Sequence, residues 1–153
     1  MSKIFRARHA MGQTVRGFAL VANDGFSARY DLDRNAGTFS RPTHKLAGQS
    51  YVGKILVLDT AKGGVASAWM LHEMQSRGVI PLAIVFNSVN PILAQGAAFG
   101  DVPMLAGFDE DITAAIASGP AAAAKAVKNK ITPATAPCSE RGKQLMPFEF
   151  SVG

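Results

Sequence analysis

The sequence predicts an α/β domain with a central parallel-type sheet flanked by helices and with additional N-terminal strands. From residue 54 onward, short apolar runs alternate with segments of helical length, which is the order typical of parallel sheets. The apolar run Leu82-Ala83-Ile84-Val85-Phe86 shows no polar alternation, as expected for a strand covered on both faces. With 153 residues, of which 48% are hydrophobic and 18% charged, the chain supports one folded domain and excludes disorder.

The first third of the chain predicts strands and turns. Residues 1–13 show no clear period, and we expect a mobile arm or one that becomes ordered on a partner. Residues 15–21 mix branched and aromatic side chains and predict a strand that ends at the turn sequence Asn23-Asp24-Gly25. Residues 26–30 predict a second strand.

The middle of the chain follows the order strand, helix, strand, helix, strand, over about residues 54–58, 65–76, 82–86, 91–98 and 102–105. Gly78 suits the left-handed position after the first helix, and Pro81 prevents that helix from resuming. Right-handed crossovers would then pack both helices against the sheet.

The last third predicts a helix that starts at Asp109 or Asp111 and stops at Gly119-Pro120. After it we expect a short helix over residues 121–130 and an extended linker over residues 132–137. Phe148 and Phe150 are expected to add an edge strand or to lie on a neighbouring subunit. The predicted division is an arm over residues 1–13, a domain over 14–118 and a docking extension over 119–153.

Charge and hydropathy narrow the classes of partner. The net charge is +5, but the sixteen Lys and Arg residues are scattered and are not interleaved with aromatic residues, so we expect no nucleic acid. An anionic small molecule or an acidic partner subunit accounts for the same charge. No apolar stretch reaches 18 residues, so no membrane span is expected and the cytoplasm is the predicted location.

The Cys and His content predicts no metal site in this chain. Cys138 is the only cysteine, which excludes an internal disulfide and an iron–sulfur cluster bound by this chain alone. His9, His44 and His72 show no spacing typical of metal ligands. His72 fits a packed or surface position, and His44, among turn residues, is the better functional candidate, although a solvated turn histidine fits equally well.

The most informative segment is the junction of the strand at 54–58 with the helix at 65–76. Lys62-Gly63-Gly64 allows a sharp backbone bend, and the free N–H groups that begin the helix point back toward it. Together with Lys62 they would hold a carboxylate or a phosphate. The alternative is a tight crossover turn with a solvated lysine. Ser67 would either meet the anion or satisfy nearby backbone groups.

A second loop, residues 87–91, follows the carboxyl end of the next strand and is predicted to face the same cleft. The alternative is that Asn90 simply caps the helix begun by Pro91. The serine-hydrolase motif Gly-x-Ser-x-Gly is absent, and so is Gly-x-Gly-x-x-Gly after the strand at 54–58, which argues against hydrolase chemistry and NAD binding.

Residues 14–118 resemble the small subunit, or swivel domain, of the aconitase X family of hydro-lyases. The resemblance is carried by Gly25-Phe26-Ser27, by His44 and the run from Gly48 to Leu58, by Lys62-Gly63, and by the run from Asn90 to Ala97. It implies a swivelling β/β/α domain that closes over a larger, cysteine-bearing catalytic subunit with an iron–sulfur cluster. It also implies dehydration of a small hydroxy acid, such as cis-3-hydroxy-L-proline or phosphorylated mevalonate.

The same resemblance implies roles for particular residues. Lys62, Gly63 and Gly64 would receive the anionic group of the substrate, Ser27 and His44 would line the cleft, and the serine that the family places after the basic residue and glycine looks like the base that abstracts the proton. Family members usually place a serine directly after the basic residue and glycine, whereas this chain has Gly64 there.

The missing serine leaves other hypotheses open. One hypothesis is that Ser67, three residues on, takes over its role as the acid or base. The other is that the chain is a catalytically silent interaction or regulatory subunit of the same fold. The run from Gly63 to Ala68 is also similar to the glycine-rich turn of phosphohistidine swivelling domains, but Ala68 stands where those domains have histidine.

Overall fold

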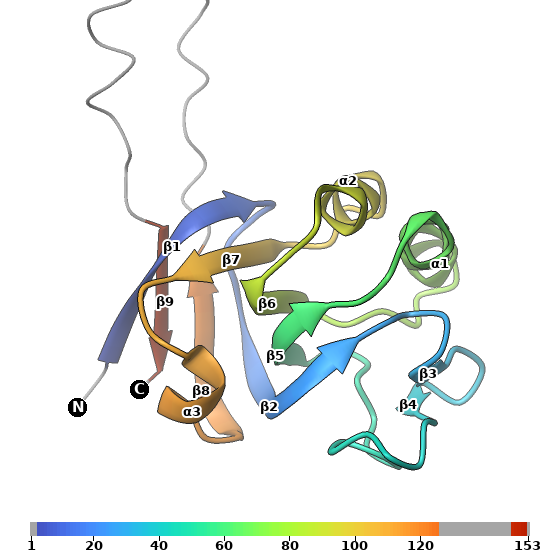
Figure 1. Cartoon of the computed structure of the whole chain (residues 1–153), viewed down its shortest axis with the longest axis horizontal. Helices are drawn as coiled ribbons and strands as arrows, with labels where there is room; N and C mark the ends of the chain where they lie inside the picture. The colour runs from blue at the N-terminus through green and yellow to red at the C-terminus, as the bar shows by residue number, and fades with distance from the viewer. Residues whose placement is uncertain (1–2, 126–147, 153) are drawn as a thin grey trace, which may run out of the picture.

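A closed barrel of strands forms the body of the protein in the computed structural model, which describes residues 3–125 and 148–152 (Figure 1). The strands follow the order β1-β7-β6-β5-β2-β8-β9 around the barrel. Their bounds are β1 (Lys3–Met11), β2 (Val15–Phe26), β5 (Ile55–Ala61), β6 (Ala83–Ser88), β7 (Met104–Phe108), β8 (Gly119–Lys125) and β9 (Phe148–Val152).

The predicted parallel sheet forms one part of this barrel. Strands β2, β5, β6 and β7 run parallel to one another, and β1, β8 and β9 join them in antiparallel pairs. The strand β5 is buried on both faces. Ile55 and Val57 pack in the same core cluster as Phe5 and Ile112, whereas Leu56 and Leu58 pack in the other cluster, with the helices.

Helices α1 (Val65–Ser76) and α2 (Pro91–Phe99) lie side by side on one side of the sheet (Figure 1). Both agree closely with the predicted bounds. Gly78 has φ +69° after α1, as predicted from its position. A Cβ atom on Gly96 would clash with Cα and Cβ of Ala68, so the two helices approach almost backbone to backbone.

The predicted strand over residues 26–30 is wrong. Strand β2 continues through Asn23-Asp24-Gly25 with a register shift against β5 between Ala22 and Gly25, and it ends at Phe26. The bulge absorbs the turn-forming residues without ending the strand. A turn follows, in which the N–H of Asp31 donates to the carbonyl of Ser27 at 2.9 Å.

A small lobe connects β2 to β5. It contains the two-stranded sheet of β3 (Leu32–Asp33) and β4 (Thr38–Phe39) and is filled by buried Phe39, Leu46 and Tyr51. This lobe places the turn after β2 beside α1.

The predicted N-terminal arm is also wrong, because its residues form β1. This strand pairs antiparallel with both β7 and β9, and Phe5 and Ala7 are buried in the barrel. Their alternation with exposed Arg6 and Arg8 is the pattern of a half-buried strand.

The C-terminal predictions are corrected in part. Helix α3 (Ile112–Ala115) is shorter than predicted, and its N-cap is Asp111, one of the two expected starts. Gly119-Pro120 begins β8, and residues 121–125 form a strand because β2 and β9 pair with them on both sides. Phe148 and Phe150 do lie in a strand, but β9 sits between β1 and β8 and is not an edge.

The predicted linker over residues 132–137, and residues 126–130 of the predicted helix, lie outside the described residues. The described parts of the predicted docking extension, β8 and β9, belong to the barrel. No helix in the described part of the chain has the length and apolar character needed to span a membrane.

Candidate functional site

The corner between β5 and α1 leaves a helix start without a cap. Gly64 is the N-cap residue and has no side chain to accept a hydrogen bond, and the first turn carries no acidic residue. The first bond of the helix is donated by the N–H of Ala68 to the carbonyl of Gly64 at 3.2 Å. The preceding N–H groups of the first turn, with the positive end of the helix dipole, therefore favour an anion.

Lys62 adds a full positive charge next to this helix start. Its backbone N–H donates to the carbonyl of Phe26 at 2.8 Å, which ties the corner to the end of β2. Its side chain lies across Gly25, where a Cβ atom would clash with Cδ and Cε of the lysine. The side chain is exposed, and among the described residues it makes no ion pair. Its ammonium group is therefore available to a ligand.

Beneath the corner lies a buried pair of hydroxyls. Oγ of Ser27, directly after β2, and Oγ of Ser67, in the first turn of α1, are 3.2 Å apart, and the two residues are 5% and 1% exposed. A Cβ atom on Gly63 would clash with Cβ and Oγ of Ser67, so Gly63 packs directly against Ser67. Because each hydroxyl carries one proton, the pair retains one further proton to donate.

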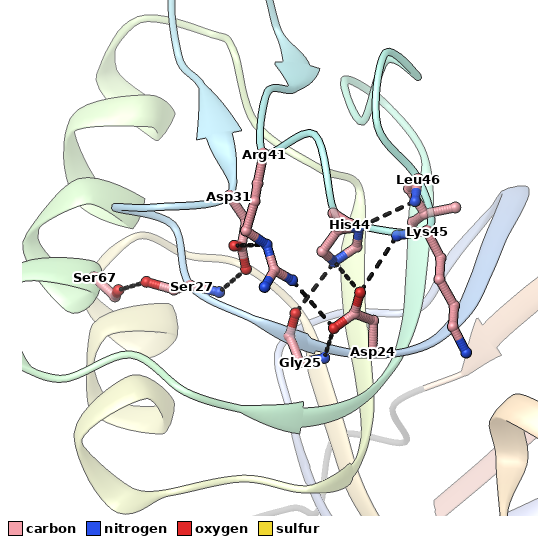
Figure 2. Close-up of polar contacts among 9 residues, drawn as sticks. All are labelled: Asp24, Gly25, Ser27, Asp31, Arg41, His44, Lys45, Leu46 and Ser67. Carbon is pink, nitrogen blue, oxygen red and sulfur yellow. Dashed lines mark hydrogen bonds and ion pairs between the residues drawn. The ribbon is translucent and has the colours of Figure 1, made fainter.

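An ionic cluster of Asp24, Asp31 and Arg41 supports Ser27 from behind (Figure 2). Nε of Arg41 lies 2.8 Å from Oδ1 of Asp31, and Nη2 lies 3.1 Å from Oδ1 of Asp24. Oδ2 of Asp31 accepts the N–H of Ser27 at 2.7 Å. The cluster thus fixes the backbone that carries Ser27.

The pKa of Asp24 shows which effects dominate in this cluster. Partial burial raises the pKa, but hydrogen bonds from the N–H groups of Gly25 and Lys45, together with the guanidinium of Arg41, more than compensate. The pKa of Asp24 therefore lies below its ordinary value, and the carboxylate is ionised at neutral pH.

His44 is a structural part of the same region. Its ring is buried and stacks on Phe39, with ring centroids 4.6 Å apart. Nε2 donates to the carbonyl of Gly25 at 3.2 Å, and Nδ1 accepts the N–H of Leu46 at 3.1 Å, an arrangement that requires the neutral ring. Both ring nitrogens are used within the protein, so His44 holds Gly25 in place.

The second predicted loop meets the first through Asn90. Oδ1 of Asn90 accepts the N–H of Leu93 at 2.8 Å, which confirms the predicted cap of α2. Its Nδ2 donates to the carbonyl of Gly63 at 2.8 Å and to that of Ala61 at 3.3 Å. The two loops are therefore neighbours, and an amide of one fixes the backbone of the other.

The structure brings most of the predicted site residues to one place. Lys62, Gly63 and Gly64 form the corner, in which Lys62 and Gly64 are exposed and Gly63 is buried against Ser67. Ser67 in turn contacts Ser27. His72 is exposed on α1 with its ring edge-on to Trp69 at 6.5 Å, which agrees with the predicted surface position.

Sequence reasoning did not single out the Asp24–Asp31–Arg41 cluster. These residues stand in turn-rich sequence, where aspartate and arginine are ordinary, and nothing local shows that they converge.

No iron–sulfur or other metal site is formed by the described residues. Nowhere in them do three or more His, Cys, Asp or Glu side chains group in a way that could hold a metal ion. A cluster that needs several cysteine ligands also does not fit a chain with one cysteine.

The barrel with two helices on one side places the chain among swivel domains. Its fold is similar to that of a chain in the crystal structure of Thermococcus kodakaraensis aconitase X in the holo-form, with a TM-score of 0.71 and 24% identity. The match covers 80% of this chain and 89% of that one, and at this identity it shows the fold alone.

Sequence comparison then identifies the family. The sequence model of the aconitase X swivel domain matches residues 4–132, so the chain belongs to this family. It is 30% identical over 107 residues to the phosphomevalonate dehydratase small subunit of Methanopyrus kandleri, covering 70% of this chain and 79% of the relative. It is 32% identical over 114 residues to the subunit of the same name from Thermococcus sibiricus, covering 74% and 85%.

Proposed function

We propose that this chain is the small subunit of an aconitase X-type hydro-lyase that dehydrates a small anionic hydroxy acid together with a large subunit. The observation that carries the proposal is the corner at Lys62, in a member of the aconitase X swivel domain family. An uncapped helix start lies there beside an ammonium group that makes no ion pair with any residue the structure describes. The names of the relatives make phosphorylated mevalonate the first substrate to test. The family resemblance of the sequence makes cis-3-hydroxy-L-proline the second.

Removal of water next to an acidic group needs an anion site, a base and help for the departing hydroxide. The corner supplies the anion site through Lys62 and the first N–H groups of α1. Ser67 is the proposed acid or base, but the residue is only 1% exposed, and its hydroxyl is hydrogen-bonded to the hydroxyl of Ser27. A substrate would meet Ser67 only after the 62–64 loop moves, and the groups that assist hydroxide departure would come from the large, cysteine-bearing subunit.

The test is reconstitution. The purified chain and the large subunit from the same source are assayed, separately and combined, for loss of water from phosphorylated mevalonate and from cis-3-hydroxy-L-proline. We expect turnover only in the mixture. A stable complex that is inactive on both compounds would instead favour the catalytically silent subunit.

Replacement of Lys62 by alanine tests the anion site. A charge-assisted hydrogen bond contributes about 1.5–3 kcal/mol, so we expect Lys62→Ala to raise KM by roughly 10- to 100-fold, with a smaller change in kcat. The matched control is Lys54→Ala. Lys54 directly precedes β5 and so lies at the opposite end of this strand from Lys62. Its ammonium is 5.6 Å from the ring centroid of Phe18. Equal KM values for the two variants would remove Lys62 from the site.

Replacing each buried serine in turn distinguishes proton transfer by Ser67 from a purely structural role of the Ser27–Ser67 pair. If Ser67 transfers the proton, Ser67→Ala lowers kcat by about 100-fold or more with little change in KM, and Ser27→Ala lowers it much less. If the pair only holds the corner, both variants lose the same hydrogen bond and change kcat and KM alike. Steady-state kinetics of the reconstituted complex distinguishes these outcomes.

A further inference from the structure

We propose that the apolar groove between α1 and α2 is the surface on which the large subunit docks, and that it receives a ridge of aliphatic or aromatic side chains. This inference rests on the proposed function, because it takes its partner from it. It adds the surface and the kind of contact, neither of which follows from membership of the family.

The groove is open and apolar. It encloses about 310 Å³, and its walls include Val65 and Trp69 of α1 and Ile92 and Phe99 of α2. These four side chains are 61%, 70%, 43% and 72% exposed, respectively. Among the described residues, no Lys, Arg, Asp or Glu lines the groove, and the polar side chains in its lining are His72 and Gln95. A partner that fits it must therefore bring apolar side chains.

The concentration of apolar side chains is unusual for a free surface. Seven large hydrophobic residues are exposed in the described part of the chain, and four of them line this one groove. Single exposed hydrophobic residues are ordinary, whereas a contiguous apolar patch marks an interaction site. Trp69 and Phe99 are also of the types that contribute most to binding energy in protein interfaces.

The position of the groove identifies the occupant. Val65, in its wall, directly follows Gly64 of the anion-receiving corner. The described residues around that corner supply an ammonium, N–H groups and hydroxyls, but no metal cluster. A protein that completes the chemistry at the corner must cover it, and its surface then continues onto the first turn of α1 and into the groove.

The groove itself has little room to rearrange. A Cβ atom on Gly96 would lie 3.0 Å from the carbonyl oxygen of Ala68 and would clash with its Cα, so the floor is formed by two helices in close contact. Docking would therefore be largely a fit of preformed surfaces, which limits its entropic cost.

The test measures affinity for the purified large subunit by titration, using Trp69→Glu and Phe99→Glu. The control is Phe18→Glu. Phe18 is also exposed, at 41%, but it lies beside Lys54, which precedes β5, and so at the opposite end of that strand from α1. We expect each groove variant to raise Kd at least tenfold, and the control to change it less than twofold. Because all three side chains are exposed, unchanged unfolding temperatures are expected and are checked first.

Trp69 also offers a direct probe, since it is the only tryptophan in the chain. Labelling with 5-fluorotryptophan gives one ¹⁹F resonance from this side chain. On addition of the unlabelled large subunit, we expect this resonance to shift and to lose its relaxation enhancement by a soluble gadolinium chelate. The same readout in Phe99→Glu should require at least tenfold more large subunit.

The outcomes separate this inference from the proposed function. If the wild-type chain forms no complex with the large subunit, both fall. If the complex forms but the groove variants bind like wild type, or the ¹⁹F signal stays accessible, only the docking surface is overturned. A dimer of the small subunit alone that is abolished by Phe99→Glu would assign the groove to a second copy and would also overturn the proposal.

Discussion

Two neighbouring corners of the sheet lead into helices, and they are built in different ways. At the β6–α2 corner, Asn90 caps the helix through Leu93, and Pro91 occupies the first helical position. At the β5–α1 corner, Gly64 offers no side-chain cap and no acidic residue stands in the first turn. One helix start is satisfied by its own sequence, and the other is left for something else to satisfy.

The difference shows how the fold reserves a place for a ligand. The satisfied corner also stabilises the unsatisfied one, because Nδ2 of Asn90 donates to the carbonyl of Gly63. Behind Gly63, Ser67 and Ser27 fill the space, and Asp31 holds Ser27. The N–H groups that begin α1 thus follow a backbone that accepts a hydrogen bond from Asn90 on one side and packs against Ser67 on the other.

Gly63→Ala should have the largest effect on this arrangement. The new methyl group would clash with Ser67, and overpacking of this kind costs about 1–3 kcal/mol. The expected result is a lower free energy of unfolding, measured by urea denaturation, together with loss of substrate binding in the complex. Gly64→Ala is the matched control, because no atom lies within 4 Å of a Cβ atom there. Equal losses in both variants would contradict the close approach of Gly63 to Ser67.

Asn90→Ala should have the next largest effect, because it removes hydrogen bonds at both the β6–α2 and the β5–α1 corner. Loss of a helix cap costs about 1–2 kcal/mol, and the carbonyl of Gly63 also loses its amide donor. We expect a drop in unfolding free energy of this size and a raised KM in the reconstituted enzyme. Asn35→Ala, at an exposed turn residue, is the control and should change neither by much. A change in stability without a change in KM would show that the two corners act independently.

Gly64→Ser should have the smallest effect on stability and should make the two corners more alike. Gly64 has φ −105° and open space for a Cβ atom, so serine fits and can cap α1. The expected gain is a few tenths of a kcal/mol. The substitution also restores the serine expected from the family resemblance, and we expect higher turnover than in Gly64→Ala, which adds the carbon without the hydroxyl. Lower stability than wild type would contradict the described N-cap geometry.

The sequence predicts the central parallel strands and their two helices well, but it does not predict how β1, β8 and β9 close the barrel. The helices at 65–76 and 91–98 and the parallel strands between them follow from local signals such as Gly78 and Asn90-Pro91. Strands β1, β8 and β9 depend on pairing between the two ends of the chain, and no local pattern shows which strands pair with which. The alanine run at 121–125 has high helix propensity, yet pairing on both sides makes it a strand.

The candidate site shows the same division. The anion-receiving corner is readable because a basic residue, two glycines and a helix start are adjacent in sequence. Its support is not readable, because Asp31 and Arg41 reach Ser27 through the turns of a lobe whose course depends on buried Phe39 and Tyr51. Tertiary packing, and not local preference, brings these charges together.

The near contact of Gly96 with Ala68 has a mechanical consequence. Two helices packed backbone to backbone at this point cannot slide past each other independently. A shift of one helix would therefore displace the other, together with the loop that precedes each of them. A protein that grips Trp69 or Phe99 and a ligand held at Gly63 would then be thermodynamically linked. If binding of the partner protein raises the affinity for the ligand, binding of the ligand must raise the affinity for the partner protein by the same factor.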